Sequence, residues 1–279
     1  MFQRLIKNDL KENKVSMLVI GLFLLLTLTL SFAATRLTVS LTSSIERFVE
    51  TAKSPHLLQM HSGSVDRERL QNFVQQHPEI ASWQLTDFVN VEGSAIRING
   101  QGSLQDSSQD NGFSSQNQNF DFLLDQNNQP AQPRPGQVYI PLYYYNSGKI
   151  KIGDQIRVGK LQLTVQGFIR DAQMNAGLVS SKRFLISQTD LQTLKKEAFA
   201  SNENLIAFRV HKLSQISTIE QAYKNAELES NGPPMITYPT IKMINGFNDA
   251  LVILVMGLLD RKSTRLNPVT RQSRMPSSA

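Results

Sequence analysis

The sequence contains no cysteine in its 279 residues. A disulfide framework, a thiolate metal site and a catalytic thiol are therefore excluded. The GxxxxGK[ST] phosphate loop, the HExxH zinc motif and the GxSxG nucleophile elbow are also missing. The four histidines are scattered and lack metal-ligand spacing. We assign no catalytic, cofactor-binding or metal-binding residue and predict that the chain is not an enzyme.

Basic charge is scarce away from the two ends, although the formal net charge is +6. Residues 261–279 carry five basic residues and no acid, and residues 1–14 add a net charge of +2. The rest of the chain is therefore close to neutral. It has no basic stripe that could follow a phosphate backbone, so we exclude nucleic acid as a partner.

The longest apolar run is residues 15–34, VSMLVIGLFLLLTLTLSFAA, which contains no charge. A helix of this length spans about 30 Å, the thickness of a bilayer's hydrocarbon core. Basic residues precede it, which predicts that residues 1–14 stay in the cytoplasm. We predict a transmembrane helix over 15–34. A cleaved signal peptide is the alternative, because SFA precedes Ala34, but the apolar run exceeds the usual length.

The segment before this run, residues 1–14, is amphipathic. Its apolar residues share one side at helical spacing: Phe2, Leu5, Ile6 and Leu10. We interpret it as a helix on the inner membrane surface. These four residues are candidates for contact with a cytoplasmic partner.

The large part, residues 35–245, alternates between strand and helix patterns and predicts an extracytoplasmic α+β domain in two lobes. A stalk helix is expected to continue from the membrane over 36–52. Three further helices are predicted, over 64–77 with Ser64 as N-cap, over 189–198 and over 214–229. Strands are predicted at 56–63, as a pair within 81–100, and at 204–213. Residues 100–118 are rich in Gln, Asn and Ser and predict an exposed, mobile loop, or alternatively a ligand-binding loop.

The densest strand signal is GKIKIGDQIRVGKLQLTVQGFIRD, residues 148–171. Short strands are predicted at 149–152, 155–158 and 161–169. The Gly153-Asp154 and Gly159-Lys160 pairs punctuate them as turns. We interpret Gly153 and Asp154 as a structural turn rather than a catalytic site.

A second apolar run, residues 250–259, is only ten residues long and is followed by a basic tail. It covers about 15 Å, half of a bilayer core. We predict the start of a second transmembrane helix over 246–260 and interpret 261–279 as a non-native tail on a fragment of a longer protein. The alternative is a short interfacial helix with a basic, membrane-surface tail.

This layout resembles a known family. IKNDLKENK leads into the apolar helix, and KIKIGDQIRV, LQLTVQGFIRDAQMN and SSKRFLIS lie in the second half of the large domain. These segments resemble the permease subunits of FtsX/MacB-type ABC transporters, particularly the large Gram-positive members. The resemblance covers residues 1–260, and 149–187 is its most specific part.

The resemblance implies a multi-pass protein of the cell membrane with a MacB-like periplasmic core domain. It implies a separate ABC ATP-binding subunit as partner, so this chain needs no cofactor of its own, and a dimer of permease halves in the lipid bilayer. In such proteins, ATP-driven closure of the cytoplasmic subunits reshapes the extracytoplasmic domain. The rival hypotheses are a single-span anchored binding or sensor module and a secreted enzyme released after Ala33.

Overall fold

The computed structural model of the chain describes residues 14–146, 148–174, 181–228, 235–237 and 246. Contacts divide the chain into two units, Met1–Phe48 and Val49–Ala279. The predictions for the amphipathic N-terminal segment, for nearly all of the second apolar helix and for the basic tail lie outside the described residues.

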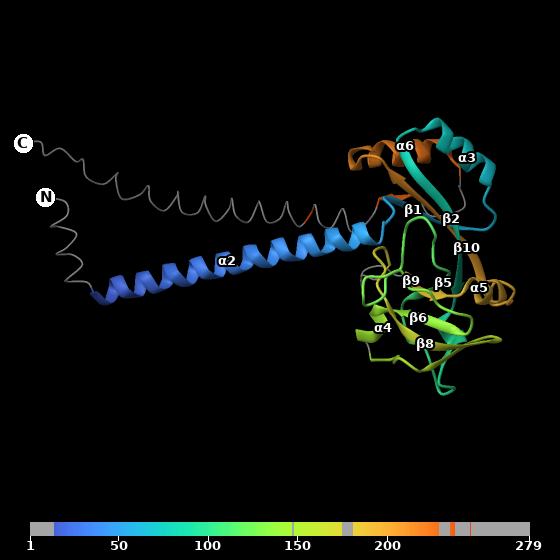
Figure 1. The fold of residues 1–279 in the computed structure, drawn as a ribbon, viewed down its shortest axis with the longest axis horizontal. Coiled ribbons are helices and arrows are strands. Elements are labelled where there is room, and N and C mark those ends of the chain that lie inside the picture. The colour runs from blue at the N-terminus through green and yellow to red at the C-terminus, as the bar shows by residue number, and fades with distance from the viewer. Residues whose placement is uncertain (1–13, 147, 175–180, 229–234, 238–245, 247–279) are drawn as a thin grey trace, which may run out of the picture. The chain divides into compact units, whose positions relative to one another are not determined.

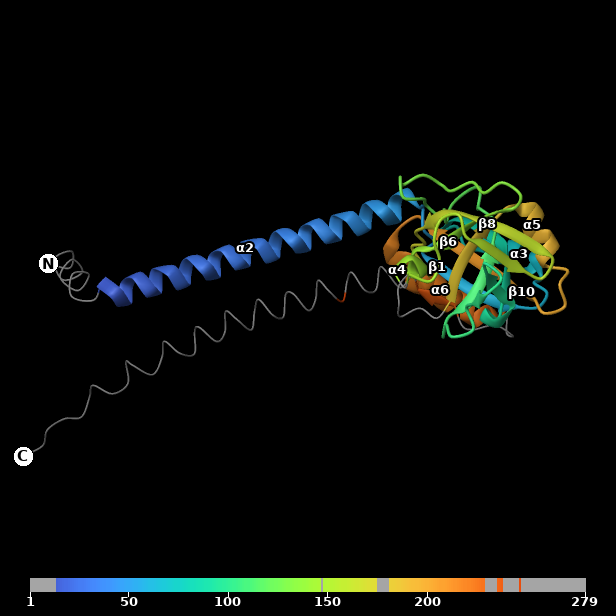
Figure 2. The same ribbon diagram turned by 90° about the horizontal axis from the view of Figure 1, so that it is seen from below.

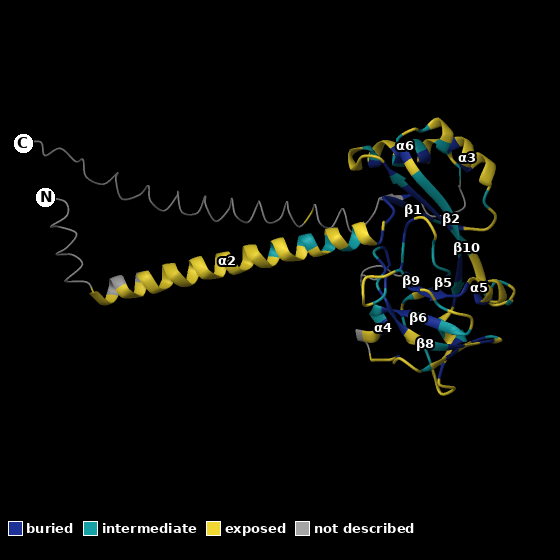
Figure 3. Ribbon diagram, viewed as in Figure 1, coloured by how far each residue is buried: buried dark blue, intermediate teal, exposed yellow. Residues whose placement is uncertain are grey.

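The first described element is α2 (Lys14–Thr51), a single helix of 38 residues. Its stretch Gly21–Thr51 contains an 18-residue window with a mean hydropathy of 1.8 and is long and apolar enough to cross a membrane. No residue in the apolar window of that stretch is buried, and Figure 3 shows α2 exposed along most of its length. A helix that is apolar all round has to be covered by another apolar phase. The predicted fold class, an apolar N-terminal helix before a large α+β domain, is confirmed.

The described strands of the domain form one mixed sheet, in the order β11-β1-β10-β2-β5-β9-β6-β8-β7-β3-β4. The pairs β5–β9 and β6–β8 are parallel, and the other pairs are antiparallel. Figures 1 and 2 show the sheet from two directions.

One hydrophobic core lies where two helices cover the first strands of this order. The elements are β1 (Leu57–Ser62), α3 (Arg67–Gln76), β2 (Ile80–Val91), β10 (Ser201–Val210), η2 (Leu213–Gln215), α6 (Ile216–Ala226) and β11 (Ile236–Thr237). Leu70 and Phe73 of α3 and Ile219 and Tyr223 of α6 are buried together. These positions are three or four residues apart, so each helix presents one apolar stripe to the sheet.

A second core lies among the remaining strands. The elements are η1 (Gly93–Ala95), β3 (Ile96–Ile98), β4 (Gly102–Ser103), β5 (Asp110–Ser114), β6 (Gln137–Pro141), α4 (Leu142–Asn146), β7 (Gln155–Val158), β8 (Leu161–Ile169), β9 (Ser181–Ile186) and α5 (Gln188–Leu194). β8 alternates buried and partly exposed residues over most of its length, as expected for a strand with one buried face.

The long strand β2 takes part in both cores. Ile80 belongs to the helix-covered core, whereas Val89 and Val91 belong to the second. Between them, the Phe88 ring packs against Gly112 of β5 so closely that a Cβ there would lie 1.7 Å from the ring. The two lobes are therefore joined by a continuous strand.

The Gln/Asn/Ser-rich stretch 100–118 was expected to be a mobile loop, and this is wrong for its centre. It contains β4 and β5, and β5 is an interior strand of the sheet. Asn111 is fully buried, and its side-chain oxygen accepts a 2.5 Å hydrogen bond from the Tyr144 hydroxyl. The Tyr144 hydroxyl and the Gln109 carbonyl thus satisfy the buried Asn111 side chain inside the sheet.

Three local details also differ from expectation. Residues 149–152 form a bend and turn rather than a strand. β2 and β3 do not pair with each other, because β2 pairs with β10 and β5 while β3 pairs with β7 and β4. The N-cap of α3 is Asp66, not Ser64, and that of α5 is Ser187. Each of these two caps accepts a backbone N–H from three residues ahead.

Candidate functional site

Of the residues singled out in the sequence, Gly153 and Asp154 lie in the turn that enters β7. Gly153 has a φ of +92°, which favours glycine. The Asp154 carboxylate accepts hydrogen bonds from the Lys151 N–H at 2.8 Å and the Asn99 amide at 3.0 Å. These bonds lower the pKa of Asp154, that from Asn99 contributing most. The turn ties two loops together. Phe2, Leu5, Ile6 and Leu10 lie outside the described residues.

Three of the four histidines have side chains that lie within hydrogen-bonding distance of backbone groups. The His56 Nδ1 accepts the Val210 N–H at 3.0 Å, and burial, aided by the Arg209 charge, lowers the pKa of His56 to about 4. His61 and His77 each approach a backbone carbonyl oxygen within 3.2 Å. Within the described residues no group of three His, Cys, Asp or Glu side chains could hold a metal ion.

The most connected polar feature is the junction between α2 and the domain, residues 52–55. Its four consecutive carbonyl oxygens each accept a hydrogen bond from the domain. The Phe122 N–H donates to Ala52 at 2.7 Å and the Asp121 N–H to Lys53 at 2.9 Å. The Arg209 guanidinium donates to Ser54, and the Gln173 amide donates to Pro55 at 3.3 Å.

The end of α2 is also closed locally. The Ser54 N–H donates to the Val49 carbonyl at 3.0 Å, and the Lys53 N–H donates to the Glu50 carbonyl at 3.0 Å. Lys53 has a φ of +45°, the left-handed conformation that ends many helices. Ala52 and Ser54 are buried. The last turn of α2, from Val49 onward, is therefore hydrogen-bonded to the residues that follow it.

Behind the junction lies a buried charge cluster of Arg183, Asp121 and Asp171. The Arg183 guanidinium donates to Asp121 at 2.7 and 3.1 Å and to Asp171 at 2.8 and 3.0 Å. The three side chains are at most 4 % exposed. Both acids carry one further hydrogen bond, because Asn117 donates to Asp121 and the Gln173 N–H donates to Asp171.

Burial sets the electrostatics of this cluster. Burial raises the pKa of the Asp121 carboxyl, and the Arg183 guanidinium opposes that shift. Burial also lowers the pKa of Arg183, but the charges of Asp121 and Asp171 more than offset this, so the pKa of Arg183 rises. Charges buried at this depth are stable only while each keeps its partners.

The cluster and the junction are parts of one network. Asp121 holds Arg183 with its carboxylate and Lys53 with its N–H. Gln173 bonds Asp171 with its N–H and Pro55 with its side chain. Asp121 and Gln173 therefore link the end of α2 to the buried ion pairs of Arg183.

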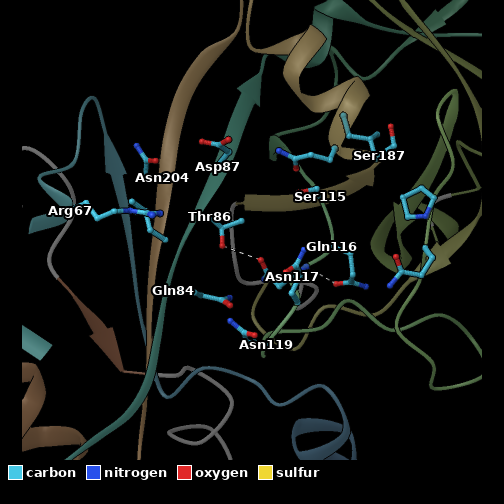
Figure 4. Close-up of a pocket in the computed structure, with 16 residues that line it drawn as sticks. Arg67, Gln84, Thr86, Asp87, Ser115, Gln116, Asn117, Asn119, Ser187 and Asn204 are labelled. Atoms are coloured by element: carbon cyan, nitrogen blue, oxygen red, sulfur yellow. Dashed lines mark hydrogen bonds between the residues drawn. The ribbon is translucent and has the colours of Figure 1, made fainter. Parts of the chain in front are cut away.

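Beside this network, an open groove of about 620 Å³ lies between β2 and the segment that follows β5. We call it the amide groove, because eight of its sixteen lining residues are Asn or Gln. Figure 4 shows several of them around its mouth, with the 3.0 Å hydrogen bond from the Thr86 hydroxyl to Asn117. Asn117 in turn donates to the Asp121 carbonyl at 3.0 Å. The groove wall thus continues directly into the junction network.

Neither the junction nor the amide groove was predicted from the sequence. The available signal was Lys182-Arg183 inside the apolar strand SKRFLI, which is buried at all six positions. A charged side chain in such a strand needs buried partners, but those of Arg183, Asp121 and Asp171, lie 62 and 12 residues away in other segments. The groove is formed partly by residues 115–118, inside the stretch whose alternative interpretation was a ligand-binding loop.

No family model and no curated protein matches the sequence. Several solved structures are similar to it, including the following three. The extracellular domain of a noncanonical ABC-type transporter, YknZ, from Gram-positive bacteria has 12 % identity and a TM-score of 0.34, with 65 % of this chain and 98 % of that chain covered. The periplasmic region of MacB from Actinobacillus actinomycetemcomitans has 11 % identity and a TM-score of 0.36, with coverages of 72 % and 96 %.

The third is a domain of a putative permease protein from Porphyromonas gingivalis, with 13 % identity and a TM-score of 0.31, covering 61 % of this chain and 82 % of that chain. All three likenesses are partial.

Proposed function

We propose that this chain is a permease subunit of an FtsX/MacB-type ABC transporter. In this proposal α2 crosses the cell membrane, the domain lies outside it, and a separate ATP-binding subunit drives the helix from the cytoplasm. The observation that carries the proposal is the continuity of α2, which passes without a break from an apolar, fully exposed stretch into the junction at residues 52–55.

The length of α2 supports a mechanical role. Its 38 residues extend about 57 Å, whereas a bilayer core is about 30 Å thick. The helix contains no proline and one glycine, Gly21, so it has few places to bend. A stiff helix that is fixed at its outer end conveys a shift or rotation to the domain. A flexible tether would serve a merely anchored domain equally well, so the hydrogen-bonded junction favours transmission.

Topology can be tested cleanly because the chain has no native cysteine. We expect Lys160→Cys, in an exposed turn, to react with a membrane-impermeant maleimide on intact cells. Gln3→Cys is expected to react only after permeabilisation. Cleavage after Ala33, or labelling of both variants on intact cells, would contradict the proposed topology.

The partner is tested separately. The tagged full-length chain, purified in mild detergent from its own host, is expected to bring down an ABC ATP-binding subunit. We expect Leu5→Asp with Ile6→Asp to abolish this association, because the two changes place charge on the apolar side of the N-terminal segment. Gln3→Asp is the matched control. Retained topology without any ATP-binding subunit would favour the single-span sensor module.

A further inference from the structure

The amide groove runs along an open edge of β2. β2 pairs with β10 over 80–90, but it pairs with β5 only at Val89–Val91. Among the described strands, residues 84–88 therefore have a partner on one side only. The four consecutive residues 84–87 all line the groove, although successive side chains of a strand point to opposite faces. The groove therefore follows the edge of the strand and not one of its faces.

The partial exposure of β2 is consistent with an open strand edge. Six consecutive residues of β2, 82–87, are half-buried, although the strand lies in the interior of the strand order. Alternate residues of an antiparallel strand turn their N–H and C=O groups to opposite sides. Some N–H and C=O groups of 84–88 therefore face the groove. Among the described residues, these groups form no backbone hydrogen bond on that side.

The amides around this edge have unused hydrogen-bonding capacity. Four exposed side chains that line the groove form no hydrogen bond within the described part of the chain: Gln118, Asn119, Gln132 and Gln188. An amide side chain both donates and accepts, as a peptide group does. Such side chains suit a ligand that presents donors and acceptors in alternation.

The lining argues against other ligand classes. No aromatic ring lines the groove, so a sugar would find no stacking surface, and only Leu85, Pro133 and Ile186 are apolar, too few for a lipid or drug. Its charged residues are Arg67 and Asp87, of opposite sign, and Asp87 is paired with Lys195 at 2.7 Å. An ionic ligand therefore has little to recognise.

We propose that the amide groove receives an extended segment of a partner polypeptide, which adds a strand to β2 at 84–88 while the groove amides bond its other peptide groups. Five residues of strand span about 17 Å, so recognition is expected to involve a short stretch of main chain. The proposal deepens the proposed function, on which it rests only for placing the partner outside the membrane.

The position of the groove gives binding a consequence. A strand seated on β2 lies beside Asn117, which bonds both Thr86 and Asp121. Asp121 holds the α2 end through its N–H bond to Lys53. Occupation of the groove and movement of α2 thus act on the same side chains.

The probe for the test is a fluorescein-labelled pool of capped nonapeptides randomised over all residues except Cys and Pro. Recognition of the main chain averages over side chains, so a random pool is suitable. The comparison pool consists of depsipeptides, in which esters replace the peptide bonds and remove the N–H donors. Fluorescence anisotropy is measured with the full-length chain in lipid nanodiscs.

We expect saturable binding of the peptide pool and at least tenfold weaker binding of the depsipeptides. Gln118→Ala, Asn119→Ala and Gln188→Ala together are expected to weaken peptide binding about tenfold, since each lost hydrogen bond costs a few-fold in affinity. Gln75→Ala with Gln76→Ala, exposed amides on α3, is the control and should leave binding unchanged. Equal melting temperatures establish that all variants are folded.

Equal affinity for the two pools, no peptide binding up to millimolar concentration, or binding of a chitin tetramer in place of peptide would overturn the proposal. The readout needs no ATP-binding subunit. If peptides bind but no ATP-binding subunit is found, only the proposed function is refuted. If an ATP-binding subunit is found but peptides do not bind, only this inference is refuted.

Discussion

Replacing Arg183 with methionine is expected to destabilise the domain strongly. The side chain is 1 % exposed and makes four hydrogen bonds of 2.7 to 3.1 Å to two buried carboxylates. Its removal leaves Asp121 in a dry environment without a counter-charge and Asp171 with only the charge of Lys182 nearby. Breaking a buried ion pair in this way costs about 3–5 kcal/mol, a large part of the 5–15 kcal/mol that stabilises a typical domain.

The origin of the loss can be separated from a simple packing defect. In the triple variant Arg183→Met, Asp121→Asn, Asp171→Asn the charges are removed together. Asn tolerates the left-handed backbone of Asp121, which has a φ of +59°. Both Asn side chains can still accept the hydrogen bonds from Asn117 and the Gln173 N–H. We expect this variant to recover at least half of the lost stability.

The assay is urea unfolding of the full-length chain in mild detergent, followed by the fluorescence of its single tryptophan, Trp83, in β2. The free energy of unfolding is compared for the wild type, Arg183→Met and the triple variant. A loss below about 1 kcal/mol for Arg183→Met would refute the assignment of a buried charge cluster. A triple variant no more stable than the single one would show that lost packing, not unpaired charge, causes the effect.

Three further outcomes follow from the geometry. Gly112→Ala is expected to cost about 2–4 kcal/mol, because the new methyl group overlaps the Phe88 ring; unchanged urea unfolding would contradict that packing. Gly153→Val is expected to cost about 1–3 kcal/mol through backbone strain alone, since a Cβ there meets no atom within 4 Å; an unaltered melting temperature would count against the turn. Folding favours the neutral form of His56, so the contribution of this residue to the free energy of unfolding is complete above about pH 6.5 and is lost as the pH falls towards 4. The loss is on the order of 1 kcal/mol by pH 5 after allowance for solvent screening. His56→Gln should flatten that part of the curve of stability against pH, and an unchanged curve would exclude His56 as its cause.

The sequence was sufficient wherever a short-range pattern settles the structure. Residues 15–34 have to avoid water on every side, which fixes a membrane-length helix without reference to any other part of the chain. The strand β7 lies between the Gly153-Asp154 and Gly159-Lys160 turns, and β8 begins directly after the second turn. The apolar stripe of α6 was likewise visible as a period of three to four residues.

The prediction from sequence was wrong where a segment of polar composition is buried. Residues 110–114 contain Asp, Asn, Gly and Ser and read as a loop, yet they form an interior strand. Their partners, β2 and β9, are distant in the chain, and the buried Asn111 side chain is satisfied by Tyr144. Propensity is a weak guide when tertiary contacts supply the hydrogen bonds.

Local sequence thus determined that this protein has an apolar helix of membrane length, an α+β domain after it and a Gly153 turn within that domain. Tertiary structure alone decided that Asp121 and Asp171 meet Arg183, that Asp121 also bonds the segment at the end of α2, and that β2 keeps an open edge beside them. The physical reason is that a buried charge or a free strand edge is defined by groups from distant segments, and a single local pattern carries no record of which of them will meet.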